Sequence, residues 1–156
     1  MISCTFENGN EGLLRHVVVH AILVQDGKIL LEKRAAKLTN GGLLCLPGGF
    51  LNRDETAAAG ALRELKEETG WDGEIISLFS IITRPDRPKE DRQNVALSFI
   101  VKPIKKAEQR DTESAEIIWM PLESLPPPEE LAFDHRDIIE TYRAHLKTPF
   151  QLPVLS

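Results

Sequence analysis

The chain has few cysteines, no long hydrophobic run and no basic N-terminus, and each absence excludes a class of protein. Its two cysteines, Cys4 and Cys45, are too few for a disulfide framework, which predicts a reducing, cytoplasmic environment. No apolar stretch approaches the roughly 20 residues of a membrane-spanning helix. The N-terminal segment MISCTFENGN lacks the basic start of a secretory signal peptide. We therefore expect a cytoplasmic protein without a membrane anchor.

Positive charge is also scarce. The chain has 19 lysines and arginines against 24 aspartates and glutamates, a formal net charge of −5. Nucleic acids and anionic membranes attract basic surfaces, so neither is an expected partner, although a small pocket of arginines fits this balance. With 156 residues and no internal repeat, residues 1–156 are expected to form a single domain that buries a core without disulfides.

Hydrophobic patterning predicts six strands and two helices. The strands are expected at 16–24, 28–34, 43–49, 74–83, 94–103 and 116–122. Asp26-Gly27 predicts a hairpin between the first two strands. Helices are expected at 52–70 and 133–146, the first with Asn52 and Glu55 as a capping box. This mixture predicts an α/β sandwich, a mixed β-sheet packed between helices.

The helix expected at 52–70 has an acidic face. Glu64, Glu67 and Glu68 lie within about 100° of arc, beside an apolar stripe that predicts the buried side. Glu64 and Glu68 form a like-charge pair that costs roughly 0.2–0.5 kcal/mol in an isolated helix. This charge pattern alone leaves two interpretations, a solvated face or a cation site.

The spacing of residues around this face favours the cation site. In order, the chain contains Gly49, Glu55, Arg63, Glu64, Glu67, Glu68 and Gly70. This pattern resembles the signature of the Nudix hydrolases, and all seven of its fixed positions match. Trp71 is the one departure, because an aliphatic residue is usual there. The motif covers a small part of the chain, but the strands around it also fit the family's α/β/α sandwich.

The resemblance implies a loop–helix–loop that binds a divalent metal, usually Mg²⁺, and hydrolyses a nucleoside diphosphate linked to another group. Carboxylates, waters and substrate phosphates are the ligands that Mg²⁺ prefers, and Mn²⁺ also takes oxygen ligands. Carried over by position, the metal ligands are the Gly48 carbonyl and the carboxylates of Glu64, Glu67 and Glu68.

The same resemblance assigns supporting roles. Arg63 is expected to orient a ligating glutamate, and Glu55 is expected to brace the loop and the helix start. Gly49 is expected to permit a backbone turn, with close approach of the substrate as a by-product.

The general base stays open between three glutamates. In the ADP-ribose branch of the family it comes from an acidic loop, which here matches residues 110–116. Glu113 is the first choice in that loop and Glu116 the second. In other branches a glutamate of the motif is the base, so Glu64 remains a candidate.

Features outside the motif point to the substrate. Pro85 follows Gly70 by fifteen residues, as in the ADP-ribose pyrophosphatase branch, and segments 46–56 and 131–139 also resemble those enzymes. The implied substrate is ADP-ribose or another nucleoside diphosphate sugar, cleaved to a nucleoside monophosphate and a sugar phosphate.

Two arginines are candidates to bind the phosphates of such a substrate. Arg34 and Arg84 are favoured because a guanidinium bonds two phosphate oxygens at once. Arg87 and Arg92 are less favoured, because charged residues are common in loops.

Two alternatives remain, and the family also permits a homodimer. One is a pyrophosphohydrolase that removes damaged nucleoside triphosphates, and the other is a non-catalytic nucleotide-sugar sensor. The intact motif favours an enzyme over the sensor.

Other conspicuous residues are expected to be structural. His20 is interpreted as a core histidine and His135 as a cap or tether of the second helix. Phe50 and Phe133 are candidates to stack on a nucleobase, but packing in the core is favoured for both.

Overall fold

The computed structural model describes residues 1–87, 93–106 and 114–156. The strands are β1 (Ile2–Thr5), β2 (Glu11–Leu14), β3 (Val17–Gln25), β4 (Lys28–Arg34), β5 (Leu44–Cys45), β6 (Gly48–Phe50), β7 (Trp71–Ile82), β8 (Val95–Lys106), β9 (Ser114–Pro121) and β10 (Val154–Leu155). The helices are α1 (Ala57–Thr69), the short 3₁₀ turn η1 (Pro128–Glu130) and α2 (His135–Lys147).

The main sheet is mixed, as expected. Its strand order is β10-β7-β8-β3-β4-β5, with β6 paired to β3 and β9 paired to β4. β3 runs parallel to β8, whereas β7 runs antiparallel to β8 and β4 antiparallel to β3. The predicted hairpin joins β3 to β4, and its turn residues Asp26 and Gly27 both have positive φ, 50° and 71°. Those angles are typical of the type I′ turns that suit the twist of a hairpin.

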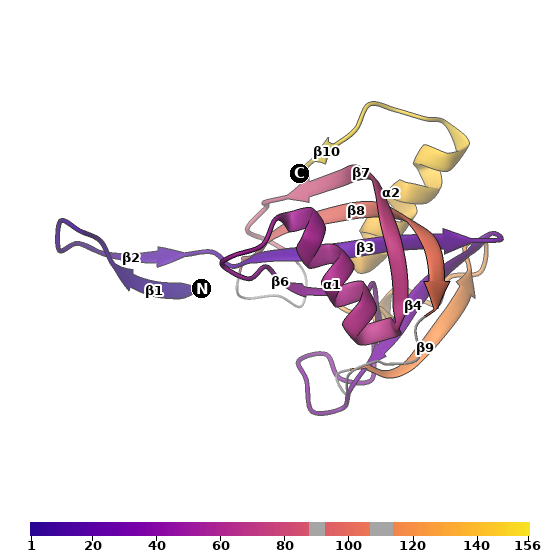
Figure 1. Cartoon of the computed structure of the whole chain (residues 1–156), viewed down its shortest axis with the longest axis horizontal. Helices are drawn as coiled ribbons and strands as arrows, with labels where there is room; N and C mark the ends of the chain where they lie inside the picture. Colours follow the sequence, from indigo (N-terminus) through magenta and orange to yellow (C-terminus); the bar gives the residue numbers. More distant parts are fainter. Residues whose placement is uncertain (88–92, 107–113) are drawn as a thin grey trace.

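The two helices cover opposite faces of the sheet (Figure 1). Because side chains alternate along a strand, β3 supplies both cores. Val18 and Ile22 pack with residues of α2 such as Ile139. Val19, Ala21 and Leu23 pack with Ala61 and Leu65 of α1. The α/β sandwich predicted from the sequence is therefore confirmed.

Helix α1 begins five residues later than the sequence predicts. Its N-cap is Thr56, whose side chain accepts a hydrogen bond from the Ala59 N–H at 3.2 Å. Glu55 still reaches back to the Asn52 N–H, at 2.8 Å, but it braces the loop before the helix. The interpretation of Asn52 as the cap of this helix was therefore wrong, because the Thr56 hydroxyl bonds the free Ala59 N–H of the first turn.

Three strands were not expected from the sequence. β1 and β2 form a two-stranded hairpin that projects away from the body of the molecule (Figure 1). Strand β10 adds two residues parallel to β7 at the edge of the main sheet. Within the described residues, none of the helices has the length and apolar character needed to cross a membrane.

Candidate functional site

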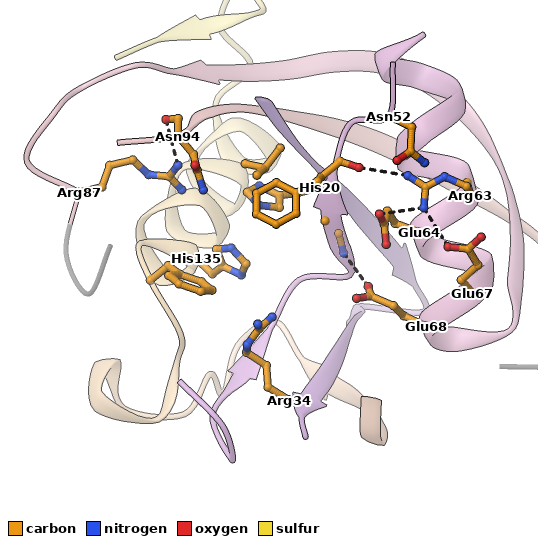
Figure 2. A pocket seen from close by; sticks show the side chains of 15 residues that line it. His20, Arg34, Asn52, Arg63, Glu64, Glu67, Glu68, Arg87, Asn94 and His135 are labelled. Atoms are coloured by element: carbon orange, nitrogen blue, oxygen red, sulfur yellow. Dashed lines mark hydrogen bonds and ion pairs between the residues drawn. The ribbon is translucent and has the colours of Figure 1, made fainter. Parts of the chain in front are cut away.

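A cavity of about 370 Å³ opens between β6, α1 and the beginning of α2. Figure 2 shows the glutamates of α1 on one side and Arg87 and His135 on the other. The cavity is lined by Val18, His20, Arg34, Gly48, Gly49, Phe50, Asn52, Arg63, Glu64, Glu67, Glu68, Arg87, Asn94, Phe133 and His135. Seven of the ten residues assigned to the site from the sequence line this cavity: Arg34, Gly48, Gly49, Arg63, Glu64, Glu67 and Glu68.

Arg63 organises the acidic side of the cavity, and its guanidinium reaches three carboxylates and one backbone carbonyl. It donates to Glu55 through Nε at 3.0 Å and Nη2 at 2.8 Å. Its Nη1 donates to Glu64 and to Glu67, each at 2.8 Å. These bonds, with the Asn52 N–H, lower the pKa of Glu55 to about 2. Arg63 thus has the orienting position that the sequence predicts.

Strand β6 holds the glycines against both α1 and β3. The Gly48 N–H donates to Glu68 Oε2 at 2.7 Å, and Glu68 is only 3% exposed. A Cβ on Gly48 would collide with the Val19 carbonyl oxygen. A Cβ on Gly49 would lie 2.6 Å from Glu64 Oε1. Gly49 lies in a strand, so the turn expected there was wrong, and its missing side chain instead makes room for the Glu64 carboxylate.

The donor set on this side suits a hard cation. Arg63 pairs with the carboxylates of Glu55, Glu64 and Glu67, and the Glu68 carboxylate lines the same cavity. Within the described ranges, the side chains are not arranged as a closed cluster of three or more metal-ligating groups. Mg²⁺ does not require such a cluster, because it keeps several waters and takes substrate phosphate oxygens as ligands. The residues present therefore fit an open Mg²⁺ site completed by water and substrate.

The opposite side of the cavity is formed by His20, Arg87, Asn94 and His135, here called the histidine wall. Arg87 binds Asp134 with two bonds, Nε to Oδ2 at 2.8 Å and Nη2 to Oδ1 at 2.6 Å. Both side chains are almost fully buried. Burial alone would raise the pKa of Asp134, but the bonds and charge of Arg87 outweigh it and lower the pKa. The pair is therefore ionised and internally neutralised.

The two histidines of this wall are buried and contact each other edge to face, with ring centroids 4.6 Å apart. The His135 Nδ1 accepts a hydrogen bond from the Leu46 N–H at 3.0 Å. Burial, with the charge of Arg87 as the next cause, lowers the pKa of His20 to about 4. Burial also lowers the pKa of His135. Both rings are therefore neutral near pH 7.

Arg34 and two aromatic rings complete the cavity. The Arg34 guanidinium donates to the Thr39 carbonyl at 2.9 Å and lies 5.3 Å from the centre of the Phe133 ring. Phe133 has a positive φ of 53°, an uncommon conformation for a bulky residue, and Phe50 is 43% exposed. The expectation that both phenylalanines pack in the core was therefore wrong, because both line the cavity.

Two candidates from the sequence lie away from this cavity. Arg84 bonds to Asp137 at 3.2 Å and lines a separate depression beside α2 and β10. Glu116 is exposed on β9, paired with Lys33, and does not line the cavity. Glu113, the first choice for general base, lies outside the described residues. The structure thus brings together Arg34, the glycines, Arg63 and the three glutamates, but not Arg84 or Glu116.

The histidine wall was missed from the sequence because its contacts span long separations. His135 and Leu46 are 89 residues apart, and Arg87 and Asp134 are 47 apart. The only local signal was polar: His20 interrupts an apolar strand, and Asp134-His135 precedes an apolar helix. Both histidines are buried, and His135 ties α2 to Leu46, as the structural interpretation expects; both also line the cavity, which the sequence did not indicate.

Known proteins resemble this chain in sequence. The family model described as the NUDIX domain matches residues 14–142. An ADP-ribose pyrophosphatase of Methanocaldococcus jannaschii is 36% identical over 126 residues, covering 81% of this chain and 72% of that protein. A human 8-oxo-dGDP phosphatase is 30% identical over 145 residues, covering 88% of this chain and 42% of that protein.

Solved structures share the fold. An ADP-ribose pyrophosphatase from Streptococcus suis matches 92% of this chain and 100% of its own, with a TM-score of 0.74 and 20% identity. The NUDIX domain of Shewanella oneidensis NrtR, solved with ADP-ribose, matches 85% of this chain and 89% of its own, with a TM-score of 0.67 and 26% identity. With its glutamate-lined helix, its mixed sheet and these matches, the chain belongs to the Nudix hydrolase family.

Proposed function

We propose that the chain is a Mg²⁺-dependent pyrophosphohydrolase that cleaves ADP-ribose or another nucleoside diphosphate sugar. The products are a nucleoside monophosphate and a sugar phosphate. The observation that carries the proposal is the cavity itself, in which the carboxylates of Glu64, Glu67 and Glu68 on α1 lie opposite Arg87 and His135 (Figure 2). The M. jannaschii relative named as an ADP-ribose pyrophosphatase supports this choice of substrate.

The carboxylates of Glu64, Glu67 and Glu68 would hold the metal, together with the Gly48 carbonyl. A bound divalent ion supplies neutralisation of phosphate charge and a lower pKa for an attacking water. Arg63 fixes the Glu64 and Glu67 carboxylates through its two 2.8 Å bonds. The Glu68 carboxylate is fixed by the Gly48 N–H, which ties the helix to β6. Mn²⁺ suits the same oxygen ligands.

The phosphate and nucleoside halves of the substrate would contact different residues. Arg34 is the arginine proposed from the sequence that lines the cavity, so we assign it to a phosphate. The exposed part of Phe50 offers a flat apolar surface to the nucleobase. Arg84 is no longer favoured, because it is engaged with Asp137 in a separate depression.

The general base is proposed among the same three glutamates. Glu64 lines the cavity, whereas Glu116 does not, so we favour Glu64 over Glu116 as the general base. Glu113 remains a candidate for the general base because of the family resemblance. The variant Glu113→Gln tests the first candidate, because loss of a base that binds no metal lowers kcat with little change in metal affinity; if Glu113→Gln keeps its kcat, Glu64 is favoured. A metal ligand would change both quantities.

The test is phosphorus NMR of purified protein with ADP-ribose, a panel of nucleoside diphosphate sugars and nucleoside triphosphates, each with Mg²⁺. We expect AMP and ribose 5-phosphate from ADP-ribose, with no product from the Glu68→Gln variant. Glu74→Gln is the matched control, because Glu74 is exposed on β7 outside the cavity. The absence of turnover on every diphosphate and triphosphate would refute the proposal.

One alternative substrate class has support of its own. The human relative is named an 8-oxo-dGDP phosphatase, which favours an oxidised purine nucleotide as a second candidate. In the NMR panel, a higher kcat/KM on such a nucleotide than on ADP-ribose would select this alternative. Binding of ADP-ribose without any turnover would select a sensor instead. We further propose that residues 1–156 form a single cytoplasmic Nudix domain.

A further inference from the structure

His135 bonds to the protein through one ring nitrogen, and it lies on the side of the cavity opposite the glutamates of α1 (Figure 2). It is the first residue of α2, is 3% exposed and lines the cavity. Its Nδ1 accepts the hydrogen bond from the Leu46 N–H, at 3.0 Å. A nitrogen that accepts a hydrogen bond carries no proton, so in the neutral ring the proton is on Nε2. The Leu46 N–H therefore makes Nε2 a hydrogen-bond donor.

This donor lacks a hydrogen-bond partner among residues 1–87, 93–106 and 114–156. A buried polar group left without a partner costs about 1–3 kcal/mol, and such groups are rare in native proteins. The cavity beside His135 is the place from which an acceptor can come. A ligand with an acceptor atom there would bond the Nε2–H and remove this energetic cost.

The Nε2–H of His135 is an uncharged donor. Burial, His20, Arg87 and Arg34 each lower the pKa of His135, so the ring does not gain a charge of its own with which to hold a phosphate. Arg87 is itself bound to Asp134 through two hydrogen bonds. His20 packs edge to face on His135 at 4.6 Å. A phosphate can instead pair with the guanidinium of Arg34 or with a bound cation.

An aromatic ring beside His135 favours a nucleobase over a sugar. The Phe133 ring lies 5.5 Å from the His135 ring and lines the same cavity. Aromatic side chains stack on nucleobases, and base edges carry ring nitrogens and carbonyl oxygens that accept hydrogen bonds.

We propose that His135 is a specificity residue whose Nε2–H donates a hydrogen bond to an acceptor on the nucleobase of the substrate. The proposal rests on the proposed function only in that the ligand is a nucleotide. It assigns the base to the histidine wall, formed by His20, Arg87, Asn94 and His135, and leaves the phosphates to Arg34 and to a cation held by the α1 carboxylates.

Two variants separate the two nitrogens of His135. In His135→Asn, Oδ1 can still accept from the Leu46 N–H, but the donor at the position of Nε2 is lost. In His135→Gln, the longer amide places an N–H near the position of Nε2 and loses the acceptor near Leu46. The first variant tests recognition of the ligand, and the second is the matched rescue of that donor.

The measurement is calorimetric binding of AMP and of ribose 5-phosphate to wild type and both variants. We expect His135→Asn to weaken AMP about tenfold, the loss of one hydrogen bond, and to leave ribose 5-phosphate unchanged. His135→Gln should recover most of the AMP affinity. Equal weakening of both ligands, unchanged AMP affinity in His135→Asn, or no AMP binding by wild type would each overturn the proposal.

Nitrogen NMR of wild type keeps the proposal testable if a variant misfolds. With ¹⁵N-labelled histidine, His135 should show a protonated Nε2 and an unprotonated Nδ1. The Nε2–H signal should shift when AMP is added and stay in place when ribose 5-phosphate is added. A purely structural His135 would show the same signal with both ligands, which would overturn the proposal.

The outcome is separable from that of the proposed function. Hydrolysis of ADP-ribose together with unaltered AMP binding in His135→Asn would remove the role of His135 and leave the enzyme activity standing. AMP binding that depends on His135, without hydrolysis of any nucleotide, would remove the activity and leave the base-recognition site standing.

Discussion

At the scale of single residues, Arg63 explains how like charges are tolerated on α1. Its guanidinium is shared among Glu55, Glu64 and Glu67, and it also donates to the Phe50 carbonyl at 3.1 Å. Arg63 therefore relieves part of the repulsion seen in the sequence. We expect a cation beside Glu68 because Glu64, Glu67 and Glu68 line one cavity and carboxylate oxygens are ligands that Mg²⁺ prefers.

Replacement of Arg63 by lysine tests this role. Arg63→Lys keeps the charge, but a single ammonium cannot bond three carboxylates in a fixed fork. We expect kcat/KM to fall about 10–100-fold, the usual loss when the support of a metal ligand is removed. Steady-state kinetics at saturating Mg²⁺ would measure it.

The control is Arg53→Lys. Arg53 pairs with Asp54, but the two side chains are 90% and 76% exposed and lie outside the cavity. We expect no change in kcat/KM from this control. Full activity of Arg63→Lys would contradict the orienting role.

The buried histidines predict how stability depends on pH. The pKa of His20 is about 4 in the folded protein, lowered chiefly by burial, against an ordinary value of 6.5. The unfolded chain therefore gains a proton below pH 6.5, while the folded protein does not until near pH 4. The free energy of unfolding should therefore fall as the pH is lowered from 6.5 to 4, by about 1 kcal/mol per pH unit for this group.

Urea unfolding at pH 7.5, 6 and 5 would measure this fall. His20→Gln removes the titrating group, so its unfolding free energy should change less over the same range. Equal pH dependence in wild type and His20→Gln would show that His20 is not buried in its neutral form.

The sequence could predict the part of the site whose residues lie at fixed spacing along one helix. Arg63, Glu64, Glu67 and Glu68 lie within two turns of one helix, so their shared face follows from helix geometry. The Arg87–Asp134 pair joins a loop to the residue before α2, and no local pattern encodes that contact. Long-range contacts of this kind depend on the packed fold.

At the scale of elements, the start of α1 depends on Thr56. Its hydroxyl accepts from the Ala59 N–H and satisfies one of the free donors of the first turn. Thr56→Ala should lower the free energy of unfolding by about 1 kcal/mol, and Thr56→Ser should retain most of it. Chemical denaturation of both variants would measure the difference. Equal stability of the two would show that the cap contributes nothing.

The edges of elements were less predictable than their existence. Each strand and helix expected from periodicity was found, but α1 begins at Ala57 because Thr56, rather than Asn52, caps it. The β1–β2 hairpin and β10 were missed because their short segments show little apolar alternation. Short strands are determined by their partners more than by their own residues.

At the scale of the whole molecule, the β1–β2 hairpin is the part of the described fold that packs least against the rest. It projects from the body (Figure 1), and Phe6, Leu13 and Leu14 are 48%, 64% and 45% exposed. An isolated hairpin of two strands is marginally stable in water. Exposed apolar residues of this kind are typical of association surfaces.

We therefore predict a homodimer that forms through this hairpin. Light scattering after size exclusion should give twice the 17.5 kDa mass of one chain. Leu13→Asp should give the monomer mass, whereas Ile104→Asp, at an equally exposed apolar residue of β8, should not. A wild-type monomer at all concentrations would contradict the prediction.

The cavity as a whole has two sides of different character. The carboxylates lie on α1, and the histidine wall with Arg87 lies across the cavity from them, with Arg34 at the end of β4. The two sides are positioned by opposite faces of one sheet, with β3 between them. This separation suits a substrate with a charged pyrophosphate and an uncharged nucleoside.

The central claim is that the α1 carboxylates hold the divalent ion on which hydrolysis depends. The most direct measurement is the rate of AMP release from ADP-ribose as Mg²⁺ is titrated, alongside binding of Mn²⁺ followed by electron paramagnetic resonance. Wild type and Glu74→Gln should show the same saturable rate and Mn²⁺ binding, and Glu68→Gln should lose both. Metal-independent release of AMP, or unchanged Mn²⁺ binding and turnover in Glu68→Gln, would contradict the claim.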